Sequence, residues 1–316
     1  MMRKSGSVAA VVAATALAVV PHADAEASFL LPDLRQAPVG CAGGHTGRPA
    51  ACADWDVCLV ADASAANGAC VATGPARAVR LRFTTAEDNV GDGPLLLYAH
   101  RDSTARPTMT VRQAFQSGVD GSIPPGHAQA QRPIPTTAYY EPAATHEHWH
   151  LTDFTHFRLR STDGTTLVTD RKNGFCLGDR YPVADARWLP GKPRGETSPA
   201  AVLAQALRGN TCAHHQPAAL DVTLGISVGY GDDYRHTVDF QWLDVTEVPS
   251  GVYDVVSTVN PDRTLLEKSY DNNTSSLAVD IRWPRGARGP GGEILRPPVV
   301  EILRSCPGKP SCAARG

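Results

Sequence analysis

The chain has 316 residues, with 30 basic and 32 acidic side chains and a formal net charge of −2 at pH 7. This length allows one large domain or two small ones, and either is long enough to bury a sizeable core. The near balance of charge predicts no nucleic-acid partner and no anionic membrane surface as a partner.

The N-terminus has the composition of a signal peptide. Arg3 and Lys4 precede an apolar run over 8–20, and Ala23-Asp24-Ala25 follows that run. This order is typical of a secretory leader with a small-residue cleavage site. We expect cleavage after Ala25, which makes 1–25 the signal peptide of a secreted, extracellular protein without stable membrane insertion. The alternative is an uncleaved anchor, which fits less well because a membrane-spanning helix needs about 20 apolar residues.

Eight cysteines follow the predicted leader, and an even number of cysteines in an exported chain indicates disulfide bonds. No two of them have zinc-finger spacing. Proximity in the sequence favours four bridges: Cys41–Cys52, Cys58–Cys70, Cys176–Cys212 and Cys306–Cys312.

The mature sequence contains several runs that alternate apolar and polar residues, with turn residues between the runs. The alternating runs cover 79–83, 108–112, 154–159, 222–228, 238–245, 253–259 and 277–283. A period of two predicts half-buried antiparallel strands. We therefore predict a mostly β protein, with an antiparallel β-sandwich-like domain, long loops and few short helices. A helix is expected over 199–208, where Ala, Leu and Gln dominate, and the composition after residue 284 predicts a linker.

The strongest chemical signal is the run His146-Glu147-His148-Trp149-His150. Alternate residues of a strand point to one face, so the three imidazoles are expected side by side. Imidazole suits copper, zinc, iron and nickel, and copper binds most tightly in the general order. His156 has the same parity and is expected to join the ligands or to support them. The triple alone leaves a copper redox site, a hydrolytic zinc site and a transport site open, and a surface cluster without metal is the remaining alternative.

Further motifs follow this run in a fixed order. The stretch from His146 continues to His156-Phe157-Arg158-Leu159, and Lys172-Asn173-Gly174-Phe175-Cys176 comes next. Asp232-Asp233-Tyr234 then precedes Asp239-Phe240-Gln241-Trp242-Leu243-Asp244-Val245-Thr246. Together these segments resemble the lysyl oxidase family, which carries a His-x-His-x-His copper signature, a Lys-x-x-Phe-Cys motif and an Asp-x-Tyr motif in this order. The likeness is good over 146–283 and weaker back to Phe83.

The resemblance implies a copper-dependent amine oxidase of the protein-lysine 6-oxidase type. It implies copper held by His146, His148 and His150, and a lysine tyrosylquinone (LTQ) cofactor formed from Lys172 and Tyr234, which are then also the catalytic residues. The implied reaction converts primary amines, with peptidyl lysine as a candidate substrate, to aldehydes with dioxygen, releasing ammonia and hydrogen peroxide. The resemblance and the composition together divide the chain into three parts after the leader. These are a disulfide-containing N-terminal part (26–135), a lysyl oxidase-like catalytic core (136–285) and a linker-like tail (286–316).

Several alternatives stay open within this interpretation. Tyr230, in a Gly-Tyr-Gly turn, competes with Tyr234 for the cofactor role, and Asp232 and Asp233 compete as the general base. The chain also departs from the family pattern, because it lacks the cysteine that follows Phe-Cys and the cysteine before the Asp-x-Tyr tyrosine. An insert over 180–210 stands before Cys212 instead. The disulfide scheme must therefore differ from that of the family.

Two other functions compete with the amine oxidase. One is a non-catalytic extracellular metal-binding or adhesion β-sandwich module, which the segment 251–281 resembles in general character. The other is a zinc hydrolase with Glu147 as its base. The hydrolase ranks last because Glu147 is expected on the strand face opposite the histidines.

Overall fold

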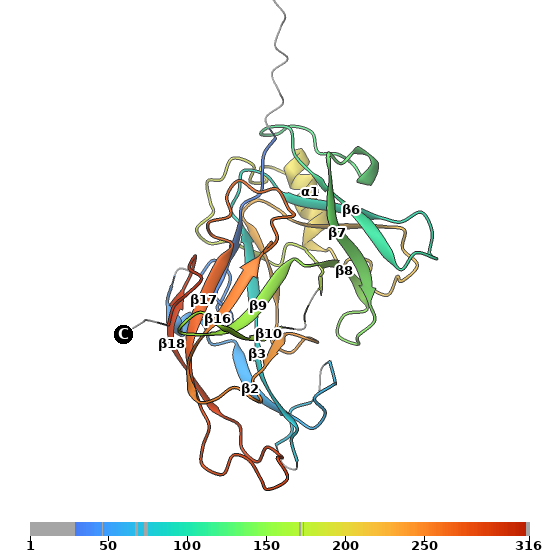
Figure 1. The fold of residues 1–316 in the computed structure, drawn as a ribbon. Coiled ribbons are helices and arrows are strands. Elements are labelled where there is room, and N and C mark those ends of the chain that lie inside the picture. Colours follow the sequence, from blue (N-terminus) through green and yellow to red (C-terminus); the bar gives the residue numbers. More distant parts are fainter. Residues whose placement is uncertain are drawn as a thin grey trace, which may run out of the picture.

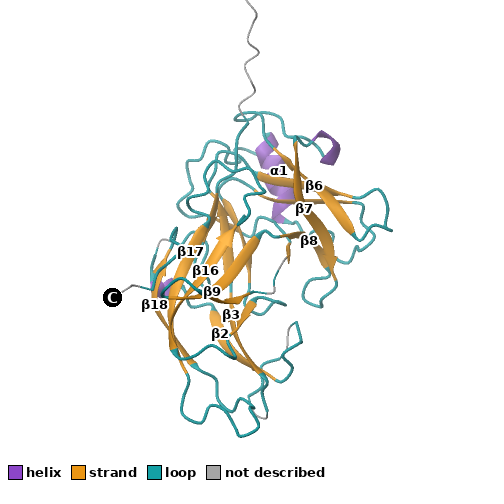
Figure 2. Ribbon diagram, viewed as in Figure 1, coloured by secondary structure: helices purple, strands orange, loops and turns teal. Residues whose placement is uncertain are grey.

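The structure is a computed structural model that describes residues 29–45, 47–66, 69–72, 75–170, 172 and 174–313. The predicted signal peptide, 1–25, lies outside the described residues. Within them the chain forms eighteen β-strands and one α-helix, together with the short 3-10 turns η1 (Pro49–Ala51) and η2 (His127–Gln129). The predicted mostly β fold is therefore confirmed, and Figure 2 shows how strands and long loops dominate it.

Two antiparallel sheets enclose one part of the main apolar core. The first comprises β9 (Thr155–Ser161), β10 (Thr166–Thr169), β16 (Gly251–Val259), β17 (Thr274–Arg282) and β18 (Val299–Cys306), in the order β10-β9-β16-β17-β18. The second comprises β2 (Trp55–Val60), β3 (Ala78–Phe83) and β15 (Trp242–Asp244), in the order β15-β3-β2. Phe83 of β3 meets Phe157 of β9 with ring centroids 5.0 Å apart. Apolar side chains from both sheets thus share one interior, and each large one contributes about 1.5–3 kcal/mol on burial.

A six-stranded sheet at the other end of the molecule carries the histidine run (Figure 1). It comprises β5 (Leu95–His100), β6 (Thr108–Ala114), β7 (Arg132–Glu141), β8 (His148–Thr152), β11 (Gly174–Phe175) and β13 (Asp221–Ile226), in the order β11-β8-β7-β6-β5-β13. Helix α1 (Pro199–Arg208) covers part of this sheet, where Leu203 packs on Leu96 and Ala114. Ser198 caps the helix by accepting a hydrogen bond from the Ala201 N–H.

A four-stranded sheet brings polar side chains into the interior. It comprises β1 (Leu34–Gln36), β4 (Thr85–Asn89), β12 (Tyr181–Pro182) and β14 (Tyr230–Tyr234), in the order β1-β4-β14-β12. All five residues of β4 are buried, although four of them are polar or charged. Buried polar groups are costly unless they are hydrogen-bonded. The polar residues of this sheet therefore indicate a functional role and not only apolar packing.

The sequence predictions of elements are mostly confirmed. The helix has the predicted bounds, and six of the seven alternating runs overlap strands β3, β6, β9, β13, β16 and β17 over most of their length. The run 238–245 is the exception, because only Trp242–Asp244 is a strand. Phe240 has a left-handed backbone (φ 62°), and Val238 N–H donates to the Arg235 carbonyl in a turn. That turn interrupts the extended conformation that the alternation predicts.

The tail expected to be linker-like over 286–316 is corrected in part. Strand β18 lies within this range and pairs antiparallel with β17, from Ser276 opposite Cys306 to Arg282 opposite Val299. Its side chains alternate only loosely between exposed and half-buried positions, as befits a strand at the edge of a sheet. The tail therefore belongs in part to the five-stranded sheet.

All four predicted disulfides are present. They join Cys41 to Cys52, Cys58 to Cys70, Cys176 to Cys212 and Cys306 to Cys312, and the described residues contain no free cysteine. Each bridge links cysteines near in sequence, but Cys176–Cys212 spans the insert over 180–210 and ties the Lys172 segment to the loop after α1. That bridge therefore shapes the site described next.

Candidate metal and cofactor site

The three histidines converge although only two of them lie in a strand. His148 and His150 belong to β8, whereas His146 lies in the preceding turn, where its N–H donates to the Ala143 carbonyl. Glu147 between them has a left-handed backbone (φ 48°). The ring centroids of His146 lie 5.4 Å from His148 and 4.7 Å from His150, and the Nε2 atoms of His148 and His150 are 2.8 Å apart. The expected grouping is present, but a turn rather than a continuous strand produces it.

Burial keeps the imidazoles neutral. His146 and His150 are 3% and 2% exposed, and His148 is half-buried. Desolvation, followed by the nearby positive charge of Lys172, lowers the pKa of His146 to about 4. Desolvation and neighbouring histidines lower the pKa of His148 to about 3, and the pKa of His150 also falls well below its usual value. Neutral imidazole is the form that binds a metal ion, so at neutral pH all three rings have the charge state that metal binding requires.

The neighbours of His150 fix its position. Gly174 of β11 lies against it, because a Cβ at Gly174 would stand 2.6 Å from His150 Nδ1. The Tyr139 hydroxyl lies 3.5 Å from His150 Nδ1 and donates to Glu141 at 3.2 Å. On the other side of the cluster, His146 Nε2 is 3.3 Å from the Asp239 carbonyl. Such outer contacts orient ligand rings in metal sites.

Lys172 lies over the ring of Tyr234. Its Nζ is 5.1 Å from the Tyr234 ring centroid and 4.9 Å from that of Phe175, and the two rings meet edge to face at 5.0 Å. Lys172 is only 3% exposed. Burial lowers the pKa of its ammonium group to about 8, although nearby carboxyl groups oppose this change. A buried lysine of this kind can act as a nucleophile, because a substantial fraction of its side-chain amine is neutral near pH 8.

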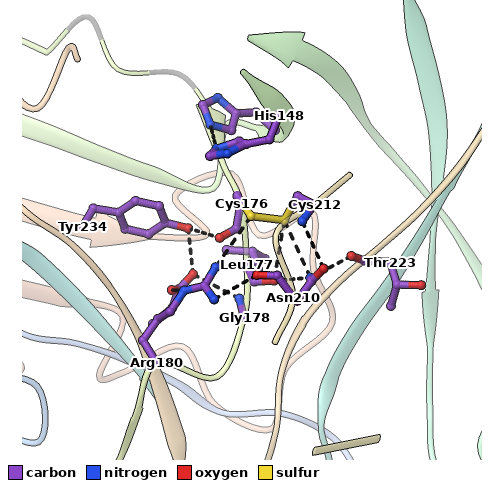
Figure 3. The surroundings of a disulfide bond; sticks show 11 residues. His148, Cys176, Leu177, Gly178, Arg180, Asn210, Cys212, Thr223 and Tyr234 are labelled. Carbon is purple, nitrogen blue, oxygen red and sulfur yellow. Dashed lines mark hydrogen bonds and ion pairs between the residues drawn. A yellow bond between two sulfur atoms is a disulfide. The ribbon is translucent and has the colours of Figure 1, made fainter. Parts of the chain in front are cut away.

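The Tyr234 hydroxyl, on the last residue of β14, is held by two hydrogen-bond acceptors. It lies 2.7 Å from Asp232 Oδ2 and 2.6 Å from the Cys176 carbonyl oxygen, both hydrogen-bond acceptors. Figure 3 shows the hydroxyl directed toward Cys176, which is bonded to Cys212. Arg180, from the insert, approaches the other oxygen of Asp232 at 3.3 Å. The insert thus contributes a cation to the site instead of lying apart from it.

A second buried carboxyl group faces Asp232. Glu87 of β4 stands directly opposite Asp232 of β14 in the antiparallel register, and neither side chain is exposed to solvent. Glu87 Oε1 accepts hydrogen bonds from Thr85 and Gln36, and Oε2 has no hydrogen-bond partner among the described residues. Burial raises the pKa of Glu87 to about 8 and that of Asp232 to about 7. Two buried carboxyl groups on adjacent strands disfavour being ionised together, so one of them is expected to be protonated.

The structure separates the sequence candidates. Tyr230 does not share the Lys172 pocket, because its hydroxyl accepts a hydrogen bond from Arg208 at the end of α1. Asp233 is exposed on the other face of β14. His156 lies 3.8 Å from Asp153 and outside the three-histidine cluster. Glu147 points away from the cluster, toward His215 at 3.5 Å.

Sequence reasoning missed several residues of the site. Glu87 lies far upstream in a strand of polar residues, and the run Thr85 to Asn89 carries no motif. Gly174 and Tyr139 contribute only by contact. A signal was available for the His214-His215 pair, which adds two imidazoles close to Cys212.

The site thus combines a cluster of three imidazoles that could hold a metal ion with a buried Lys–Tyr pair, in a mostly β fold. The sequence model of the lysyl oxidase family matches residues 206–283, a range that contains Asp232 and Tyr234 but neither the three histidines nor Lys172. Lysyl oxidase homolog 2 of Gallus gallus is 32% identical over 129 residues, and its Homo sapiens counterpart is 30% identical over the same length. Lysyl oxidase homolog 2A of Danio rerio is 33% identical over 129 residues.

These matches confirm the resemblance to the lysyl oxidase family. Each match covers 40% of this chain but only 13% of the Gallus gallus and Homo sapiens relatives and 14% of the Danio rerio relative. Within the described part of the chain, no helix combines the length and the apolar character that a membrane crossing requires.

Proposed function

We propose that this chain is a secreted copper-dependent amine oxidase that acts on primary amines, with peptidyl lysine as a candidate substrate and dioxygen as the oxidant. The observation that carries the proposal is the position of Lys172 Nζ over the Tyr234 ring at 5.1 Å, with both residues buried near three neutral histidines. A family match that includes Tyr234 supports it independently.

The donor set fits copper. His146, His148 and His150 would hold the ion through neutral imidazole nitrogens, which suit copper among first-row metals. When bound there, copper would supply redox chemistry with dioxygen at the Tyr234 ring, and a cofactor built from Tyr234 and Lys172 would supply the electron sink for converting an amine to an aldehyde, with ammonia and hydrogen peroxide as the other products.

The residues of the chain prepare this chemistry. The Tyr234 hydroxyl is held by Asp232 and the Cys176 carbonyl, so its ring has one orientation toward Lys172. Lys172 must lose a proton before its amine attacks, and desolvation favours that loss. Of the carboxyl pair Glu87 and Asp232, one group holds a proton and the other remains a carboxylate that accepts one. Asp232, which touches the Tyr234 hydroxyl, is the group best placed to act as the general base.

Export supports the same proposal. The four disulfides fit an oxidising compartment, and the leader-like composition of 1–25 provides a route to it. We propose that the leader is removed near Ala25 and that the chain works outside the cell. A non-catalytic metal-binding module is the function to adopt if the following experiment fails.

The test is production of hydrogen peroxide from n-butylamine and from a lysine-containing peptide by the copper-loaded chain in air. We expect Lys172→Arg and Tyr234→Phe to reduce the rate to the background of copper alone, since arginine cannot be deprotonated to attack the ring. The matched controls are Lys268→Arg, an exposed lysine paired with Asp92, and Tyr230→Phe, both of which should keep the wild-type rate. Peroxide production at the wild-type rate by Lys172→Arg would refute the proposal.

A further inference from the structure

A second group of potential metal ligands stands at the surface beside the histidine cluster. Glu147, His214 and His215 each place one donor atom within 4.8 Å of the others. Glu147 Oε2 lies 3.5 Å from His215 Nδ1, and the rings of His214 and His215 are 3.7 Å apart. All three side chains are exposed or half-exposed. None of them has a role in the chemistry proposed above.

The backbone holds these donors together. The Trp149 N–H donates to the Cys212 carbonyl, and the His215 N–H donates to the Glu147 carbonyl, at 2.9 and 2.8 Å. These bonds join the loop after α1 to the start of β8, and the Cys176–Cys212 disulfide anchors the same loop. Glu147 and His215 both have left-handed backbones, at φ 48° and 57°. Such conformations cost energy for residues other than glycine, and here they direct the Glu147 side chain out toward His215.

The surface group is continuous with the buried cluster. The His214 ring centroid lies 6.1 Å from that of His148, and His148 lies 4.7 Å from His150. Exposure falls along this series, because His215 is 63% exposed at its side chain whereas His150 is 2% exposed. Five of the eleven histidines of the chain thus form one unbroken series from solvent to the interior.

We propose that Glu147, His214 and His215 form a second metal site for a divalent ion of the copper type, and that His148 passes this ion from there to the buried histidines. Two imidazoles and one carboxylate suit such an ion. A hydrated cation would first meet the exposed carboxylate, then exchange its waters for imidazole nitrogens one at a time. Each new metal–nitrogen bond replaces a bond to the previous ligand, so the transfer needs no change in oxidation state. The exposed site stands independently, and only its transfer role rests on the metal site of the proposed function.

The first experiment counts copper ions. The metal-free full chain is dialysed against copper(II) chloride, and bound copper is measured per chain. We expect two ions for the wild type, one for His150→Ala, and one for the double variant His214→Ala/His215→Ala. Combining all three substitutions should abolish binding. The matched control His156→Ala/His236→Ala removes two histidines that each pair with a single aspartate outside both groups, and it should keep two ions. A wild-type count in the His214→Ala/His215→Ala variant would overturn the exposed site.

The second experiment measures transfer. Metal-free chain is mixed with one equivalent of copper, a chelator is added at intervals, and the copper that resists removal is measured. We expect the His214→Ala/His215→Ala variant to fill the buried site more slowly than the wild type, with the same final occupancy. Equal filling rates would overturn the transfer role.

Neither experiment depends on amine oxidation, so failure of the enzyme proposal leaves both interpretable. If His150→Ala bound as much copper as the wild type, the assignment of the buried histidines would fail instead, and the exposed site would still be judged by the His214→Ala/His215→Ala count.

Discussion

At the scale of single residues, the chemistry of the site depends on charged side chains that are buried without enough partners to offset their desolvation. Lys172, Glu87 and Asp232 are charged residue types with almost no exposed surface. Residues of these types are rarely buried unless they are paired. Their pKa values move toward neutrality for the same reason, since desolvation penalises the charged form of each. Perturbed titratable groups gathered in this way are typical of a functional site.

The raised pKa of Glu87 predicts how stability changes with pH. Its folded-state pKa is about 8, above the ordinary value of 4.5, because burial disfavours the carboxylate. The native chain therefore binds more protons than the unfolded chain between these values, so the stability that Glu87 contributes is complete below pH 4.5 and is lost as the pH rises through about 8. Glu87→Gln imitates the protonated form. We expect its free energy of unfolding to fall less between pH 5 and 9 than that of the wild type.

Urea denaturation at pH 5, 7 and 9 measures this difference. The control is Glu196→Gln, an exposed carboxyl group in the insert, which should reproduce the wild-type slope. Identical pH slopes for Glu87→Gln and the wild type would show that Glu87 is not a buried, protonated carboxyl group.

Gly174 gives a test of how His150 is positioned. A methyl group at this position would meet His150 Nδ1 at 2.6 Å and the Tyr139 hydroxyl at 2.7 Å, so one of the rings must move. We expect Gly174→Ala to weaken copper binding about 10- to 100-fold, as changes next to ligand histidines do, and to cost about 1–3 kcal/mol of stability from overpacking. Gly209→Ala is the control, because nothing lies within 4 Å of a methyl group there. Unchanged copper affinity in Gly174→Ala would contradict this account of His150.

The sequence predicted the site residues that belong to a motif, but it did not predict those whose role comes only from a contact in the folded chain. His146, His148, His150, Lys172 and Tyr234 could be chosen from spacing and from the family resemblance. Glu87 could not, because its role comes from standing opposite Asp232 across two strands that are far apart in the sequence. Gly174 sits within a recognised motif, but only the packing shows why a side chain is excluded there.

At the scale of elements, the site depends on loop segments that hydrogen bonds and a disulfide hold in place, more than on long regular strands. The Lys172 segment enters the sheet only through the two-residue strand β11, and the 212–215 loop is attached by one backbone hydrogen bond to Trp149 of β8 and by another to Glu147 just before it. The Cys176–Cys212 disulfide joins both segments. Period-two alternation predicted six strands, but it did not identify β7, which is the longest strand at ten residues, or β11, β12 and β18, which are short or lie at the edges of sheets.

The disulfides differ in the length of chain that they close, and this predicts unequal effects on stability. Cys176–Cys212 spans 36 positions and Cys306–Cys312 spans 6. The loop-entropy argument gives a loss of about 4 kcal/mol for the first and about 2 kcal/mol for the second when both cysteines become serine. Denaturant unfolding of the two double-serine variants measures this. We also expect only the first variant to lose metal, because only its bridge adjoins the histidine cluster. Equal stability loss with full copper binding in both variants would contradict the anchoring role.

At the scale of the whole molecule, separate sheets meet at one place. The six-stranded sheet supplies His148 and His150, and the turn before it supplies His146. The four-stranded sheet supplies Glu87, Asp232 and Tyr234, and the segment before Cys176 supplies Lys172. Sequence could nominate the members of this group, and it predicted a sandwich. It could not show that residues 62 positions apart share one buried pocket, since that convergence depends on long-range pairing between strands.

The measurement that tests the central claim most directly is mass spectrometry of the digested chain after copper loading in air. The account predicts a covalently joined peptide pair with the bridge between Lys172 and Tyr234, formed because the amine already lies over the ring at 5.1 Å. The pair should be absent from chain kept free of copper, from chain loaded without dioxygen, and from Lys172→Arg. Fully copper-loaded, aerated protein that yields the Lys172 and Tyr234 peptides only as separate species would contradict the account.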